Sequence, residues 1–111
     1  MASWMYNWMR DDGHGDYIGR WDPIPGSGYP YPSDTVSGTQ TGDVTFYDWE
    51  NNGSKDHAGI IVGWGTDPDP KSGLTGDLTD QHTSNRFHSI WHLRPYNAQW
   101  ATTAIYVRRP K

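Results

Sequence analysis

The chain has 111 residues and no cysteine, which fits one domain or part of one and excludes disulfides, thiolate metal sites and a thiol nucleophile of its own. Its formal net charge of −4, with no basic run, gives no support for nucleic-acid binding, and no apolar run is long enough to span a membrane. Hydrophobic residues reach only 33% but aromatic residues reach 14%, so rings are expected to fill much of the core.

The first segment, residues 1–10, is predicted to form a short helix. Its methionines recur every four residues and share one face, and its two tryptophans share a neighbouring face. These residues are Met1, Met5 and Met9, and Trp4 and Trp8. An apolar helix at the very start suggests that residues 1–111 are a single domain forming the C-terminal part of a larger unit.

The rest of the chain is predicted to form an antiparallel sheet. Apolar and β-branched runs separated by turn residues are typical of short strands. The predicted strands are residues 17–21, 44–49, 57–64, 78–83, 89–93 and 103–108. The Gly-, Pro-, Ser- and Thr-rich residues 23–42 are expected to be a surface loop, residues 51–54 a tight turn and residues 67–75 a polar loop. The fold class is therefore α+β, a short N-terminal helix followed by a curved antiparallel sheet or open barrel.

The first candidate for chemistry is a histidine at the start of a predicted strand. Gly42 and Asp43 open one strand, and His57 opens the next strand one hairpin later, just before an apolar run. A histidine in that place has an apolar anchor behind it and a cleft in front, which suits a general base. Taken alone, the motif is better explained as a surface histidine beside a turn.

A second polar segment, residues 81–86, follows His57 by one loop and lies in a neighbouring predicted strand. His82 or Asn85 has the chemistry to hydrogen-bond the far ring nitrogen of His57, which would fix its tautomer and stabilise the imidazolium. Taken alone, this segment is better explained as a polar turn with a capping Asn.

The order and spacing of these motifs resemble a bacterial amidase domain of the papain-like, NlpC-like superfamily. In that family a Gly-Asp strand precedes a strand that begins with the catalytic histidine, and a His-Thr-x-Asn/Asp-Arg segment and a Trp-containing strand follow. The resemblance implies that His57 is the general base of an amide hydrolase and that His82 orients it, with Asn85 as the rival. The matching segments are residues 4–9, 42–49, 56–58, 81–86 and 89–94.

The resemblance also implies a cleft that binds a peptidoglycan peptide or a similar amide, in a secreted or cell-envelope protein. Asp43, Trp49, Trp64 and Arg86 are the expected binding residues, although tryptophans are core residues by default. Neither a cofactor nor a metal is expected. The first residues do not resemble a signal peptide, so any export signal would lie outside the chain.

The departure from the family is the absence of its nucleophilic cysteine, which the family places on an earlier helix. Alone, the chain is expected to be inactive, with the cysteine coming from an upstream segment or a partner chain. It is then a truncated domain, one part of a split or processed protein, or a pseudoenzyme that keeps the cleft as a binding site. The abrupt apolar start favours the first two. Ser3 is a weaker candidate nucleophile, because its position does not match the family's cysteine.

Two metal sites and two other functions remain as alternatives. Residues 48–56 are similar to the start of a calcium loop, but a tight turn fits better. A zinc site built from His57, His82 and Asp43 lacks any supporting spacing. The chain is alternatively a non-catalytic module that binds cell wall or a partner through an aromatic groove, or a fragment of a secreted toxin or effector.

Overall fold

A computed structural model describes residues 2–11, 13–22, 35–68, 72–81, 86–100 and 102–111. Within these ranges, a single α-helix precedes six strands and one short 3-10 helix. The elements are α1 (Ala2–Asp11), β1 (Gly15–Trp21), β2 (Val44–Asp48), β3 (His57–Thr66), β4 (Thr75–Gln81), β5 (Arg86–Ile90), η1 (Arg94–Tyr96) and β6 (Ala104–Pro110). The prediction of an α+β chain that is mostly sheet is confirmed.

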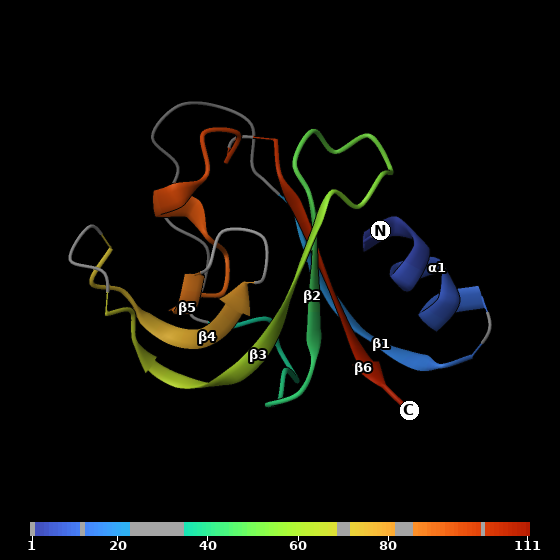
Figure 1. The fold of residues 1–111 in the computed structure, drawn as a ribbon, viewed down its shortest axis with the longest axis horizontal. Coiled ribbons are helices and arrows are strands. Elements are labelled where there is room, and N and C mark those ends of the chain that lie inside the picture. The colour runs from blue at the N-terminus through green and yellow to red at the C-terminus, as the bar shows by residue number, and fades with distance from the viewer. Residues whose placement is uncertain (1, 12, 23–34, 69–71, 82–85, 101) are drawn as a thin grey trace.

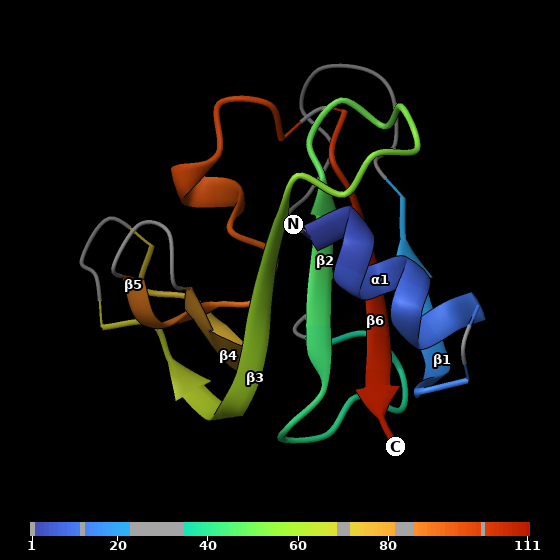
Figure 2. The same cartoon turned by 45° about the vertical axis from the view of Figure 1, so that its right-hand side comes forward.

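The six strands form one open antiparallel sheet in the order β1-β6-β2-β3-β4-β5 (Figure 1). The C-terminal strand β6 lies between β1 and β2, so the first and last strands of the chain are neighbours. Register shifts interrupt the β1–β6, β3–β4 and β4–β5 ladders, and such irregularities bend a strand and increase its twist. The sheet is accordingly curved, and β3 and β4 bend away from the helix side (Figures 1 and 2).

Several element boundaries differ from the sequence prediction for reasons visible in the ladders. β3 extends through Gly65 and Thr66, beyond its predicted end at residue 64, because these residues pair with Gly76 and Thr75. β4 accordingly begins at Thr75, earlier than the predicted strand at residues 78–83. The strand predicted at residues 89–93 ends at Ile90, and Leu93 has the left-handed backbone φ of 56°. Residues 82 and 83, the end of another predicted strand, lie outside the described residues.

Both faces of the sheet carry a hydrophobic core, which explains why all five residues of β2 are buried. One cluster lies under α1 and consists of Ala2, Tyr6, Met9, Val44, Phe46, Ala104 and Tyr106. The other covers the opposite face and consists of Tyr47, Ile90, Trp91, Leu93 and Ile105. Alternate residues of a strand point to opposite faces. Phe46 therefore packs toward α1, while Tyr47 packs away from it.

Aromatic edge contacts and one serine hold α1 against the sheet. Tyr6 meets Phe46 edge-on, with ring centroids 5.1 Å apart, and Tyr106 at 5.4 Å. The Ser3 hydroxyl accepts a 2.6 Å hydrogen bond from the Lys55 main-chain nitrogen and donates to the Lys55 carbonyl. Ser3 therefore fastens the helix to the hairpin. No helix among the described residues has the length and apolar character needed to cross a membrane.

Candidate active site

The β2–β3 hairpin positions His57. The turn between its strands is held by the buried Asp48 carboxylate, which accepts hydrogen bonds from the main-chain nitrogens of Asn52 at 3.1 Å and Gly53 at 2.8 Å. His57 then starts β3 directly opposite Tyr47. The oxygen-rich turn thus satisfies its own backbone, and no group of three or more His, Cys, Asp or Glu side chains in the described ranges is arranged to hold a metal.

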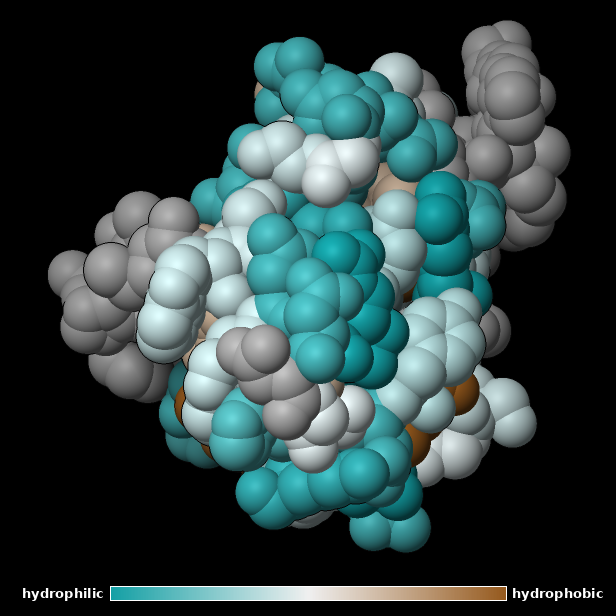
Figure 3. Space-filling model, turned by 90° about the vertical axis from the view of Figure 1, so that its right-hand side faces the viewer, coloured by the Kyte–Doolittle hydropathy of each residue, from teal (hydrophilic) through white to brown (hydrophobic). Residues whose placement is uncertain are grey.

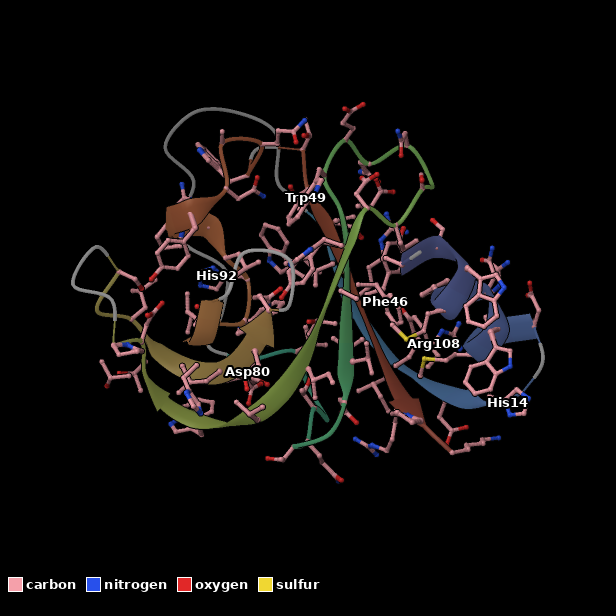
Figure 4. All side chains as sticks on the ribbon, in the orientation of Figure 1. His14, Phe46, Trp49, Asp80, His92 and Arg108 are labelled. Atoms are coloured by element: carbon pink, nitrogen blue, oxygen red, sulfur yellow. The ribbon has the colours of Figure 1, made fainter. Side chains whose placement is uncertain are left out.

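The His57 ring is half-buried among aromatic side chains on the face of the sheet opposite α1. The Trp49 ring is stacked on it, with centroids 5.5 Å apart and an interplanar angle of 24°. The Tyr47 ring lies 5.5 Å away at 43°. Trp49 is fixed in turn, because its carbonyl accepts a 2.7 Å hydrogen bond from the Thr102 hydroxyl. Figure 4 shows Trp49 where β2 meets the hairpin turn.

The Gln81 carboxamide is the polar partner of the His57 ring. Its Oε1 is hydrogen-bonded to His57 Nε2, and Gln81 is only 1% exposed. Gln81 ends β4 and pairs with Gly59 of β3. The missing side chain of Gly59 leaves the space that the carboxamide fills, since a Cβ there would lie 2.4 Å from Gln81 Nε2.

A chain of buried hydrogen bonds sets the orientation of the Gln81 carboxamide. Its Nε2 faces the Tyr47 hydroxyl at 3.3 Å and Thr79 Oγ1 at 2.5 Å. Both oxygens have a main-chain acceptor for their own hydrogen: the Tyr47 hydroxyl donates to the Trp91 carbonyl at 2.5 Å, and Thr79 to the Ser89 carbonyl at 3.4 Å. The two hydroxyl oxygens are therefore free to accept from the amide NH2 group. The amide oxygen is left to face His57.

Burial is the main influence on the protonation of these groups. It lowers the pKa of His57, and the hydrogen bond to Gln81 offsets part of that decrease. Burial also raises the pKa of Tyr47, so its hydroxyl keeps its hydrogen at neutral pH. His57 is then mainly a neutral imidazole near pH 7, the form that accepts a proton. Within the described part of the chain, its Nδ1 makes no hydrogen bond.

Asp43 lies at the far end of β2 from His57. Asp43 precedes Tyr47 by four positions along the strand, which corresponds to roughly 13 Å. Its carboxylate, 1% exposed, receives Arg109 Nε at 2.8 Å and Nη2 at 3.0 Å, and the Gln40 main-chain nitrogen at 2.8 Å. The structure thus gives Asp43 an ion pair that ties the end of β2 to β6, and does not bring it to the imidazole.

The other predicted site residues fall into three groups. Trp49 is brought to His57, whereas Trp64 is 59% exposed and seven positions further along β3, roughly 20 Å away. The main chain of Arg86 pairs with Gln81, which places the residue beside the site, but its side chain is outside the described part. His82 and Asn85 also lie outside it, so the orienting role predicted for either stays a prediction. Gln81 is the first residue of the predicted polar segment 81–86, and the sequence alone gives it no role.

The comparisons with known proteins give one match. The family model described as "Putative amidase domain" matches residues 2–107, which is nearly the whole chain. Neither the search of curated proteins nor the search of solved structures gives a match. The match covers the helix, the His57 hairpin, strands β1 to β5 and the first part of β6. The chain therefore belongs to the putative amidase domain family.

Proposed function

We propose that this domain is the base-bearing part of a papain-like Cys–His amide hydrolase that cleaves a peptidoglycan peptide or a similar amide. The observation that carries the proposal is the His57 ring, half-buried and bonded through Nε2 to a buried carboxamide. Its other nitrogen makes no hydrogen bond within the described residues. A general base needs this combination: a ring held in a fixed geometry, an imidazole that is neutral near pH 7, and one nitrogen available to accept a proton.

The chain contains no cysteine, so we propose that the nucleophile comes from a Cys-bearing segment or a partner chain. His57 takes the thiol proton, and the thiolate sulfur attacks the amide carbon. The C–N bond breaks, and His57 returns the proton to the leaving amine. Water then gives a proton to His57 and its OH group to the acyl carbon. The C–S bond breaks and His57 returns the proton to the sulfur, which releases the acid and restores the thiol.

The position of His57 restricts the face of the sheet from which that thiol can approach. His57 lies on the Tyr47 face of the sheet, whereas α1 covers the Phe46 face. Ser3, the alternative nucleophile, lies on α1 and has its hydroxyl engaged by the Lys55 main chain. The thiol therefore has to reach the sheet face that α1 leaves free. The aromatic wall of Trp49 beside His57 is suited to pack against the apolar part of a peptide substrate.

The direct test supplies the missing nucleophile. The chain is fused to, or mixed with, the proposed Cys-bearing segment, and amide hydrolysis is measured on purified muropeptides. We expect activity only with the cysteine present, and a loss of at least roughly 100-fold in kcat for His57→Ala. His14→Ala is the matched control, because His14 is exposed and belongs to the α1 side. Activity that survives His57→Ala would exclude the proposed base.

A second candidate function, wall binding without catalysis, is favoured by an exposed row of stacked rings. Trp4 is 70% exposed and Trp8 is 39% exposed, with nearly parallel rings whose centroids are 6.5 Å apart. Trp8 also stacks on His14 at 4.0 Å. Flat exposed rings present apolar faces against which sugar rings pack. Figure 3 shows this side of the molecule, which is mostly hydrophilic or near neutral, with only small hydrophobic spots.

Sedimentation with purified cell wall separates the two candidates. If the ring row binds glycan, Trp4→Ala with Trp8→Ala abolishes co-sedimentation, and His57→Ala leaves it unchanged. Trp64→Ala is the control for the loss of an exposed tryptophan elsewhere, because Trp64 lies on β3 and is 59% exposed. Equal retention of the double variant and the wild type would exclude a binding role for the row.

A further inference from the structure

We propose that Gln81 is the positioning residue of His57, accepting the Nε2 hydrogen and so fixing the tautomer whose free lone pair is on Nδ1. The positioning role rests on the proposed function, in which His57 is the base, whereas the tautomer is a property of the fold alone.

The tautomer follows from donors and acceptors around the carboxamide. The Tyr47 and Thr79 hydroxyls have carbonyl acceptors for their hydrogens and can only accept from Gln81. The amide nitrogen must then face these two oxygens, which turns Oε1 toward His57. Since an amide oxygen carries no hydrogen, the His57 nitrogen opposite it has to be the donor. Nε2 is thus protonated, and Nδ1 is the base nitrogen.

Burial and packing make this arrangement rigid. Gln81 is 1% exposed, and its carboxamide fills the space left by Gly59. A flip of the amide would turn its NH2 group toward His57 and leave the two hydroxyl oxygens facing the amide oxygen. Three buried hydrogen bonds would be lost. The nitrogen that meets the thiol is therefore selected by residues of β2 and β4.

The arrangement also serves both protonation states of the ring. When Nδ1 takes a proton, Nε2 keeps its hydrogen and the bond to Gln81 is preserved. A neutral carboxamide stabilises the imidazolium less than a carboxylate would. The ring therefore remains able to return its proton to the leaving amine. Replacing the amide by an apolar group or by a carboxylate should then move the His57 titration in opposite directions.

The experiment is NMR on the ¹⁵N-histidine-labelled chain, compared with Gln81→Met, Gln81→Glu and the matched control Gln99→Met at an exposed position. In the wild type we expect a neutral ring with its hydrogen on Nε2 and with slow exchange of that hydrogen with water. Gln81→Met should abolish the slow exchange and lower the His57 titration midpoint, Gln81→Glu should raise the midpoint, and Gln99→Met should change neither.

Two results would overturn the proposal: an Nδ1-protonated neutral ring in the wild type, or exchange and titration unaffected in Gln81→Met. The first is measured on the unaltered chain, so the proposal stays open to refutation even if a variant does not fold. With the Cys-bearing segment present, Gln81→Met should lower kcat roughly 10- to 100-fold with little change in KM. An inactive wild type would count against the proposed function alone, because the NMR result decides the tautomer independently.

Discussion

Gly59→Ala is a sharp test of the buried carboxamide, because it adds one methyl group and removes no polar atom. The new Cβ would lie 2.4 Å from Gln81 Nε2 and 2.9 Å from its Cδ, so the carboxamide has to move. Its three side-chain hydrogen bonds, to His57, Tyr47 and Thr79, contribute about 1 kcal/mol each. The lower entropy cost of Ala relative to Gly in a strand recovers about 0.5–1 kcal/mol. The free energy of unfolding should therefore fall by about 2–2.5 kcal/mol.

Gly63→Ala is the matched control on the same strand, since an added Cβ there meets no atom within 4 Å. It should leave the unfolding free energy unchanged or raise it by up to about 1 kcal/mol. The assay is urea denaturation followed by tryptophan fluorescence, with both variants and the wild type measured in parallel. Equal stabilities of the two variants would show that the carboxamide does not occupy the space beside Gly59.

Three further predictions concern groups outside the imidazole site. Burial lowers the pKa of His92 from 6.5 to about 4. Between these pH values the unfolded chain takes up a proton that the folded chain does not. The free energy of unfolding should therefore fall by up to about 3 kcal/mol as the pH drops from 7 to 4. His92→Gln should reduce the slope of unfolding free energy against pH in that window; a slope equal to that of the wild type would contradict a buried neutral His92. Asp43→Asn should lower the free energy of unfolding by about 2 kcal/mol, because it weakens the ion pair with Arg109. It should leave the kcat of the Cys-supplemented enzyme unchanged. A lower kcat in a variant that is fully folded would place Asp43 in the cleft. Added calcium should not raise the Tm in a thermal scan, because the Asp48 carboxylate already accepts two main-chain hydrogen bonds; a rise of several degrees would restore the calcium-loop hypothesis.

The fold class could be predicted because its signals are local. The helix residues recur with helical spacing, and the hairpin turn at Asn51 and Gly53 carries residues that accept a positive φ, here 54° and 88°. Strand ends were less predictable, because the length of β3 depends on its pairing with β4 rather than on its own residues. The outward position of Trp64 contradicts the default expectation of a tryptophan core. The residue type alone does not determine whether a tryptophan side chain faces the core or the solvent.

The candidate site was predictable in part. His57 at the mouth of a strand follows from the turn and the apolar run, and the structure brings Trp49 to it. Gln81 could not be chosen over His82 or Asn85, because that choice depends on the register of β4 against β3. The register aligns Gly59 with Gln81, and a sequence read one strand at a time does not contain it. Gly59, two positions after His57, was the one sign in the sequence that another side chain could pack beside the histidine.

The position of β6 between β1 and β2 has a consequence for how the chain reaches its native state. β1 joins the sheet through β6, which lies far downstream of it in the sequence. On the ribosome, β1 therefore cannot form its ladder until β6 has been made. Contacts that span nearly the whole chain slow folding and leave strand edges unpaired meanwhile. The newly made domain should therefore depend on chaperones until β6 has been made.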